Sequence, residues 1–133
     1  TVLKGAPKSG EMFERRGNVR LDLGKCTKNA GQDPAPHWQS ALEDFERASG
    51  LLQKGDLLAT TLYNQACANC LLSGVRAADA TGRKSRADDI DQAILCLERA
   101  MAEGWKDLDL MKSDSDLEPL RTDQRFRKLV GVK

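Results

Sequence analysis

One short pattern occurs twice along this chain and constrains its fold more than any other feature. It consists of an alanine, a large apolar residue four positions later, and a second alanine three positions after that. Spacings of three and four place all three residues on one face of an α-helix. The copies begin at Ala41 (A-x3-F-x2-A) and at Ala93 (A-x3-L-x2-A). The sequence therefore predicts two matching helices, as expected for an internal duplication.

A further helix is predicted upstream of each copy, over 11–25 and 56–73, and each pattern reaches a glycine near its end. The sequence has neither the alternating apolar pattern of a strand nor an Asn-Gly hairpin signal. We therefore predict an all-α fold with two antiparallel helical hairpins, 11–53 and 56–103. Residues 104–130 are expected to form a short helical cap, and residues 1–10 a flexible N-terminal segment.

Small residues recur at the places where the helices of each hairpin would approach one another. Gly17 and Cys67 lie at matching positions on the two first helices, while Phe45 and Leu97 would fill the space between neighbouring hairpins. In these features the sequence resembles the tetratricopeptide repeat (TPR) family. That resemblance implies a helical repeat scaffold that binds other proteins.

The C-terminal segment carries the most specific resemblance. After Gly104-Trp105 the sequence D-L-D-L-M-K-S-D-S-D-L-E-P-L-R-T-D-Q-R-F is similar to the tail that closes many bacterial and plastid TPR arrays, D-P-D-L-x-P-L-R-x-D-P-R-F. Ser115 and Gln124 replace the usual prolines. The plastid members include thylakoid PDZ–TPR proteins that assist photosystem II assembly, to which the likeness is distant.

The two copies recur at about 50 residues, whereas a common TPR repeat has about 34. We place the extra length in two long loops inside the hairpins, over 26–36 and 75–86. Loops at matching positions would project from the same edge of the array. The second loop is rich in positive charge and could contact an acidic partner. Its candidate contact residues are Arg76, Arg83, Lys84 and Arg86.

The two ends of the array are expected to differ. Apolar residues of the C-terminal segment would form a lid over the last hairpin, whereas the first hairpin has no comparable cover. The first hairpin is therefore a candidate for self-association or for docking to a partner. The expected lid residues are Leu108, Leu110, Leu117, Leu120, Phe126 and Leu129.

Composition argues against several classes of function. The formal net charge is +1, which gives no general attraction to nucleic acid, and no apolar run approaches the ~20 residues of a membrane span. The only histidine, His37, lies where a helix begins, and we expect an exposed first-turn residue. No phosphate-binding loop or catalytic arrangement is evident. We therefore predict a protein that is not an enzyme and carries no cofactor or metal.

Two sequence features could suggest a metal or redox site, and both have a structural interpretation. Cys67 and Cys70 form a C-x-x-C, but they lie in the middle of a predicted helix, where buried thiols act as small apolar groups. Asp114 and Asp116 alternate as in a calcium loop, but the glycine and glutamate of that loop are missing, so helix capping is expected. A thiol or metal module remains the weaker alternative.

Cysteine usage and the N-terminal residues suggest a compartment. The four cysteines are too few for a disulfide framework and fit a reducing intracellular compartment, such as the cytoplasm or the plastid stroma. The first ten residues contain no apolar stretch of the kind found in a signal peptide.

The TPR resemblance also implies a binding groove, because the first helices of TPR hairpins line the concave face. Glu14 stands where chaperone-binding TPRs carry a lysine, so a helical or extended protein segment fits better than a chaperone tail. We therefore predict a non-enzymatic adaptor or assembly factor; the alternative is a permanent structural subunit of a larger complex. The groove positions are Glu14, Asn18, Leu21, Asn64, Ala68 and Leu71.

Overall fold

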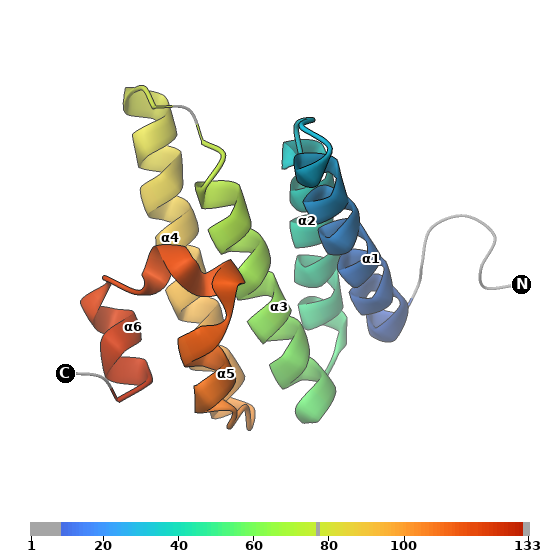
Figure 1. Cartoon of the computed structure of the whole chain (residues 1–133). Helices are drawn as coiled ribbons and strands as arrows, with labels where there is room; N and C mark the ends of the chain where they lie inside the picture. Colours follow the sequence, from blue (N-terminus) through green and yellow to red (C-terminus); the bar gives the residue numbers. More distant parts are fainter. Residues whose placement is uncertain (1–8, 77, 132–133) are drawn as a thin grey trace, which may run out of the picture.

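The fold is all-α, as predicted. The computed structural model describes residues 9–76 and 78–131, which form seven helices and no strand. Figure 1 shows the long helices side by side, with the shorter C-terminal helices in front of the last hairpin and at its outer side. The helices are α1 (Gly10–Asn29), α2 (Ala35–Leu51), α3 (Asp56–Ser73), α4 (Ala80–Ala102), α5 (Leu108–Ser113), the 3₁₀ helix η1 (Ser115–Leu120) and α6 (Gln124–Leu129).

The first hairpin, α1 and α2, depends on two glycines that let the helices approach closely. A Cβ atom at Gly17 would lie 2.7 Å from Cε1 of Phe45, and one at Gly24 would lie 2.2 Å from Nε1 of Trp38. Both aromatic side chains are buried against α1, and the Trp38 indole donates to the carbonyl of Leu21 at 3.1 Å. The aromatic rings thus occupy the space that larger α1 residues would need.

The second hairpin, α3 and α4, packs through small and medium-sized side chains. Ala66, Cys70, Ala93 and Leu97 are all buried in the larger of the two apolar clusters. The smaller cluster joins the hairpins to each other, since it combines Trp38, Leu42 and Phe45 of α2 with residues of α3. Both copies of the alanine motif therefore lie in the core.

The C-terminal segment covers the second hairpin as a cap. Leu117 and Leu120 of η1 are fully buried, Phe126 of α6 is buried, and Leu108 and Leu129 are partly buried against the same cluster. The predicted lid is confirmed for these five residues. It is wrong for Leu110, which is 40% exposed, because it lies on the outer side of the short helix α5.

The predicted long loops are wrong, because most of their residues are helical. Helix α1 continues to Asn29 and α4 begins at Ala80, where the Asp79 carboxylate accepts a hydrogen bond from the Gly82 amide. The connections that remain are 30–34 and 74–79, so the extra repeat length comes mainly from longer helices. The predicted flexible segment 1–10 is also wrong at its end, since Ser9 caps α1 and Gly10 begins it; residues 1–8 lie outside the described residues.

Among the described residues, none of the helices combines the length and the apolar character that a membrane crossing requires.

Candidate interaction surface

Three of the predicted groove residues come together between α1 and α3. The Asn64 side chain on α3 donates to Oδ1 of Asn18 on α1 at 3.1 Å, and the Asn18 amide donates to Oε1 of Glu14 at 2.7 Å. These side chains form a hydrogen-bonded chain from one hairpin to the other. Their polar groups therefore satisfy each other and help to fix the spacing of the hairpins.

The three apolar groove positions have different surroundings. Leu21 is 6% exposed and Ala68 is fully buried, both in the cluster that joins the hairpins. Neither side chain is open to a ligand. Leu71 is only partly buried, and it packs against the same cluster beside Val75. Of the apolar groove positions, Leu71 is the one that an approaching protein segment can contact.

The basic residues expected on a loop lie at the tip of the second hairpin. Arg76, in the connection, donates two hydrogen bonds to Asp89 of α4 at 2.8 and 3.1 Å, and this pairing raises the pKa of the arginine. Arg83, Lys84 and Arg86 belong to the first turns of α4. Arg83 donates to the backbone carbonyl of Ala78, Arg86 donates to those of Ser73 and Arg76, and Lys84 is exposed.

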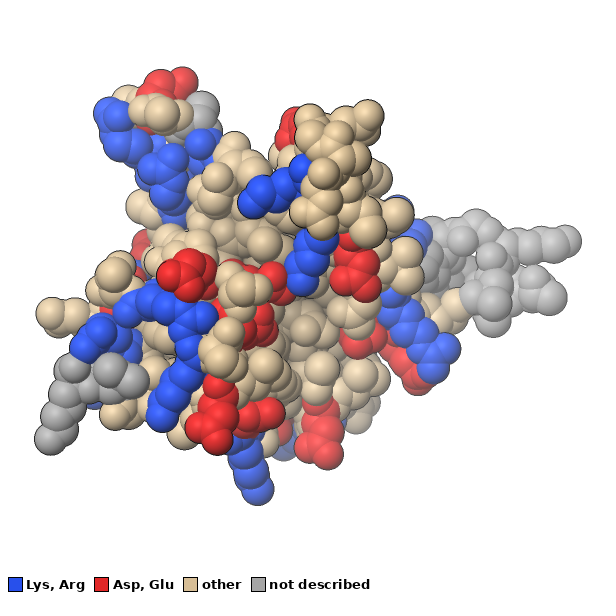
Figure 2. All heavy atoms as spheres, in the orientation of Figure 1, with Lys and Arg blue, Asp and Glu red and all other residues tan. Residues whose placement is uncertain are grey.

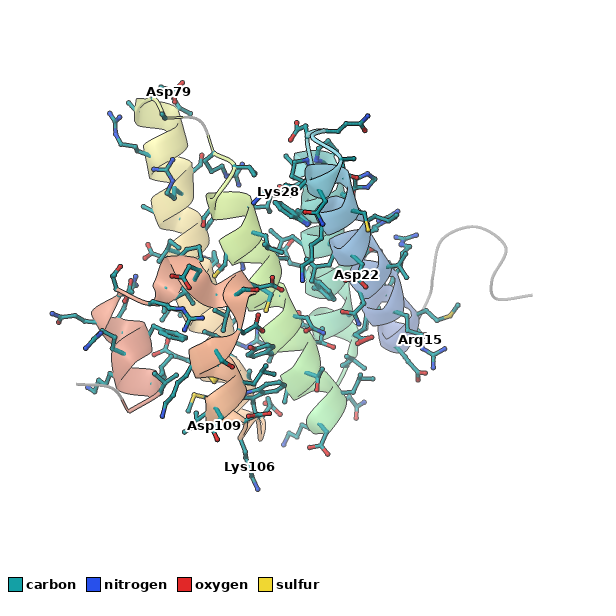
Figure 3. All side chains as sticks on the ribbon, viewed as in Figure 1. Arg15, Asp22, Lys28, Asp79, Lys106 and Asp109 are labelled. Atoms are coloured by element: carbon teal, nitrogen blue, oxygen red, sulfur yellow. The ribbon has the colours of Figure 1, made fainter. Side chains whose placement is uncertain are left out.

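The surface is hollowed between the tips of the two hairpins. Figure 2 shows this hollow, with positive side chains gathered on the second hairpin tip and also present on the side of α1. Lys28, near the end of α1, lies at the edge of the hollow (Figure 3). Leu71 and Val75 supply partly buried apolar surface at the same end of the molecule. We call the set Lys28, Leu71, Val75, Arg83, Lys84 and Arg86 the inter-tip surface.

A second, open hollow of about 440 Å³ lies between α4 and the start of α6. Its two carboxylates, Asp91 and Asp123, both pair with Arg125, at 3.0 and 2.9 Å. Arg83 and Arg86 also line this hollow, above the apolar side chains of Ala87 and Ile90. Arg83 and Arg86 therefore border this hollow as well as lying at the tip of the second hairpin.

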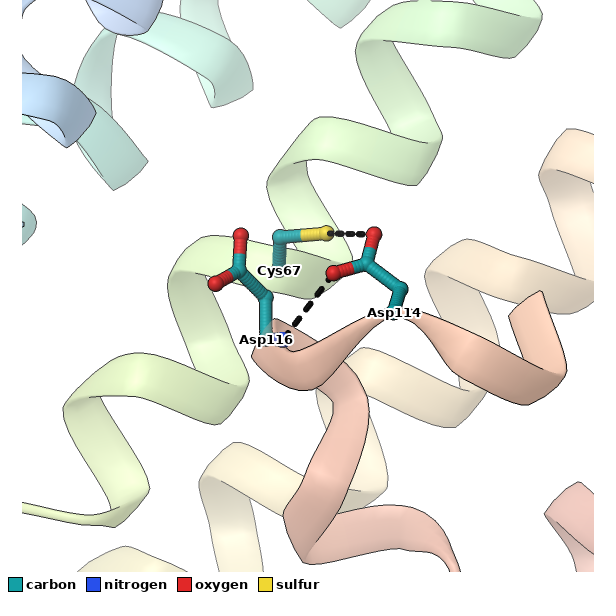
Figure 4. A group of neighbouring side chains, drawn as sticks. All are labelled: Cys67, Asp114 and Asp116. Atoms are coloured by element: carbon teal, nitrogen blue, oxygen red, sulfur yellow. Dashed lines mark hydrogen bonds between the residues drawn. The ribbon is translucent and has the colours of Figure 1, made fainter. Parts of the chain in front are cut away.

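Cys67, Asp114 and Asp116 lie close enough together to be considered as metal ligands, with their donor atoms within 4.8 Å of one another (Figure 4). All three groups already have partners. Asp114 Oδ2 accepts a hydrogen bond from the Tyr63 hydroxyl at 2.6 Å and faces Cys67 Sγ at 3.9 Å. Asp116 pairs with Lys25 Nζ of α1 at 2.8 Å.

Burial, followed by the neighbouring carboxylates of Asp114 and Asp116, raises the pKa of Cys67 well above its usual value, so the thiol keeps its proton and faces the Asp114 carboxylate. Burial, followed by the hydrogen bond to Asp114, also raises the pKa of Tyr63. The hydrogen bonds and the ion pair of this cluster hold the C-terminal segment against α3 and α1.

Other residues of the C-terminal motif secure the same segment. Arg121 donates to the backbone carbonyl of Asp114 at 2.9 Å and to that of Lys112, which ties η1 to the end of α5. Trp105 stacks on Tyr63 with ring centroids 4.1 Å apart and an interplanar angle of 9°. Asp114 also caps η1 by accepting from the Asp116 amide, as predicted. The conspicuous C-terminal motif thus has a packing role.

The C-x-x-C lies near the middle of α3 rather than at a helix N-terminus, as the sequence indicated. Cys67, Cys70 and Cys96 are buried and free, and Cys26 is exposed and free. Burial raises the pKa of Cys70, and burial also raises the pKa of Cys96 to about 12. Such thiols are poor nucleophiles at neutral pH.

An ion network on the first hairpin was missed by the sequence reasoning. Asp44 of α2 is 2% exposed and accepts two hydrogen bonds from Arg16, at 3.0 and 2.8 Å, and one from Arg20 at 2.9 Å. The two arginines are four residues apart and share a face of α1. The spacing of the two arginines indicated a shared binding face, but the sequence could not identify Asp44, on another helix, as the residue that they bind.

Comparison of this chain with protein-family models, with curated proteins and with solved structures found no significant match.

Proposed function

We propose that this chain is a non-enzymatic, TPR-like adaptor or assembly factor that binds an acidic protein segment at the inter-tip surface. The observation that carries the proposal is the unpaired positive charge at the start of α4. Arg83, Lys84 and Arg86 form no ion pair with any carboxylate in the part of the chain that the structure describes.

The carboxylates around these cations are largely engaged elsewhere. Asp79 caps α4, Asp89 pairs with Arg76, and Asp91 and Asp123 pair with Arg125. A partner carboxylate would therefore meet arginines that remain available on their outer side. Guanidinium groups suit this role because they bind carboxylates through two parallel hydrogen bonds.

Apolar surface beside the charges would add affinity. Leu71 and Val75 are partly buried, and an apolar side chain of the bound segment could remove their remaining surface from water. The elongated helices α1 and α4 favour the same site, since Lys28 lies in the last turn of α1 and Lys84 in the first turns of α4, at the hairpin tips between which Figure 2 shows the hollow.

Binding can be tested with a double charge reversal at the start of α4. We would immobilise the intact chain and its Arg83→Glu/Lys84→Glu variant, capture partners from the source extract without crosslinking, and map the contact by crosslinking on the intact chain only. The matched control is Lys54→Glu/Lys106→Glu, which makes the same change in net charge at two exposed lysines elsewhere. Acidic residues are tolerated at a helix N-terminus, so the test variant should fold.

The proposal predicts a partner that is crosslinked near Lys84, lost in the test variant and retained by the control. Equal capture by both variants would contradict the inter-tip surface as the binding site.

A permanent structural subunit is a second candidate, favoured by one observation. Val19 and Leu23 of α1 are 59% and 46% exposed and lie four residues apart, so they form one apolar patch on a helix face that a permanent partner could cover.

A further inference from the structure

The outer face of α1 has a buried counterpart on α3. The buried positions of the two helices correspond when Gly17 is matched with Ala66, one residue from the Cys67 that the sequence pattern suggested. Phe13 then matches Leu62, and Leu21 matches Cys70, and all of these residues are buried. This alignment also matches one further face of α1 with a face of α3. The matched pairs are Met12 with Thr61, Arg16 with Gln65, Val19 with Ala68, and Leu23 with Leu72.

On α3 this face is covered by helix α2. Gln65 is hydrogen-bonded to Ser49 of α2 at 3.2 Å, and Ala68 and Leu72 are buried in the cluster that contains Trp38, Leu42 and Phe45. The equivalent face of α1 has no helix over it among the described residues, because α1 is at the end of the row (Figure 1). The structure therefore contains the same kind of helix-receiving face twice, covered once and open once.

From this comparison we propose that the outer face of α1 is a docking site for an amphipathic, acidic helix of a partner protein. We define the outer face as Met12, Arg16, Val19 and Leu23. Their spacing of four, three and four residues is the one that pairs two helices along a continuous seam. The proposal concerns a different surface from the inter-tip surface and does not depend on it.

Charge indicates the chemistry of the partner. Asp44 is shared by Arg16 and Arg20, whose side chains remain 34% and 33% exposed. Arg47 lies over the Phe13 ring at 5.3 Å from its centroid. Asp44 and Arg47 share one side of α2 with Leu51, which is 52% exposed. Two arginines thus share one buried carboxylate and a third lies over the neighbouring Phe13 ring, and a helix with Asp or Glu beside its apolar stripe would complement this excess of positive charge.

The same charges argue against a second copy of the chain as the occupant. Two outer faces brought together would add the Arg16, Arg20 and Arg47 of one copy to those of the other, which increases the local positive charge instead of neutralising it. The outer face also cannot stack on the second hairpin of another copy. That end is already covered by α5, η1 and α6, which bury Met111 and Leu117. Residues 1–8 carry Lys4 and Lys8 and no carboxylate, so they lack the required chemistry as well.

The test uses a synthetic helical peptide of about 20 residues, with leucines at the seam spacing and glutamates beside them. Its matched control carries lysines in place of the glutamates. Binding of each peptide to the intact chain would be followed by fluorescence anisotropy. The protein variant is Val19→Ser/Leu23→Ser, and the control variant is Leu95→Ser/Leu110→Ser, which changes two exposed leucines on other helices.

We expect the glutamate peptide to bind, with a Kd raised at least tenfold by Val19→Ser/Leu23→Ser and changed less than twofold by the control. Arg47→Gln should raise the Kd about threefold, within the range of an exposed ion pair. Circular dichroism would verify that each variant is folded.

Three results would each overturn the proposal: no binding of the glutamate peptide, equal binding of the lysine peptide, or equal binding to both double variants. Sedimentation of the chain alone adds a fourth. A dimer that Val19→Ser/Leu23→Ser abolishes would identify a second copy as the occupant instead.

Discussion

Replacing Gly24 by alanine should destabilise the protein, although alanine is the better helix former. A Cβ at this position would lie 2.2 Å from Trp38 Nε1 and 2.4 Å from Cδ1, well inside contact distance. The indole is 1% exposed and has no free space to move into without displacing α1. The helix should therefore separate from α2, or the tryptophan should leave its rotamer.

The magnitude follows from three contributions. Alanine in a helix interior gains about 1 kcal/mol over glycine. Overpacking a filled core costs about 1 to 3 kcal/mol. Losing the hydrogen bond from Trp38 to the Leu21 carbonyl costs about 1 kcal/mol more. So short a contact indicates an overpacking cost near the upper end of this range. The net loss in the free energy of unfolding is then about 2 to 3 kcal/mol.

The assay is urea unfolding followed by circular dichroism, with Gly50→Ala as the matched control. Gly50 is also helical, but nothing lies within 4 Å of a Cβ there. Its substitution should therefore stabilise the protein by about 0.5 to 1 kcal/mol. The two substitutions have opposite predicted signs. A Gly24→Ala protein as stable as wild type would refute the close packing of α1 on Trp38.

Three further predictions concern the tail and the cysteines. Tyr63→Phe should lower the free energy of unfolding by about 1 kcal/mol, because it removes the hydroxyl that donates to Asp114; an unchanged urea midpoint would contradict this bond. In the native protein at pH 8, a thiol reagent such as DTNB should label Cys26 quickly and the three buried cysteines only on unfolding; rapid labelling of Cys67 would contradict its raised pKa. Hydrogen bonds from Arg125 lower the pKa of Asp123 below 3.8, so the stabilisation is present above that pH and lost as the pH falls below it. Asp123→Asn should therefore cost about 0.5 kcal/mol at pH 7, and this cost should shrink as the pH is lowered below 3.8, as measured by urea unfolding over that range.

The sequence predicted the helices best where one face is buried along their whole length. The bounds of α3 were predicted correctly, and both alanine motifs lie in the core, because apolar periodicity directly reflects burial. The first turns of α4 were mistaken for a loop. They contain Arg83, Lys84 and Arg86 and extend past the end of α3 in Figure 1, so they bury few apolar residues and show no periodic pattern.

The predicted binding residues were harder to interpret because their partners come from other helices. Asn18 and Asn64 are polar residues on the expected helices, but whether they face a ligand or each other depends on the spacing of the hairpins. Asp44 appears in the sequence as one more charge in a polar stretch. Its burial between Arg16 and Arg20 is a consequence of tertiary packing alone.

Hydrogen–deuterium exchange of the intact chain, free and bound to the captured partner, tests the central claim most directly. The claim is that the molecule is a binding module whose contacts lie on its open surfaces, while the C-terminal segment serves to close the fold. Protection is predicted at 80–87, the start of α4, with added protection at 12–23 if the partner also presents an acidic helix. Protection confined to 107–130, with none at the start of α4, would contradict it.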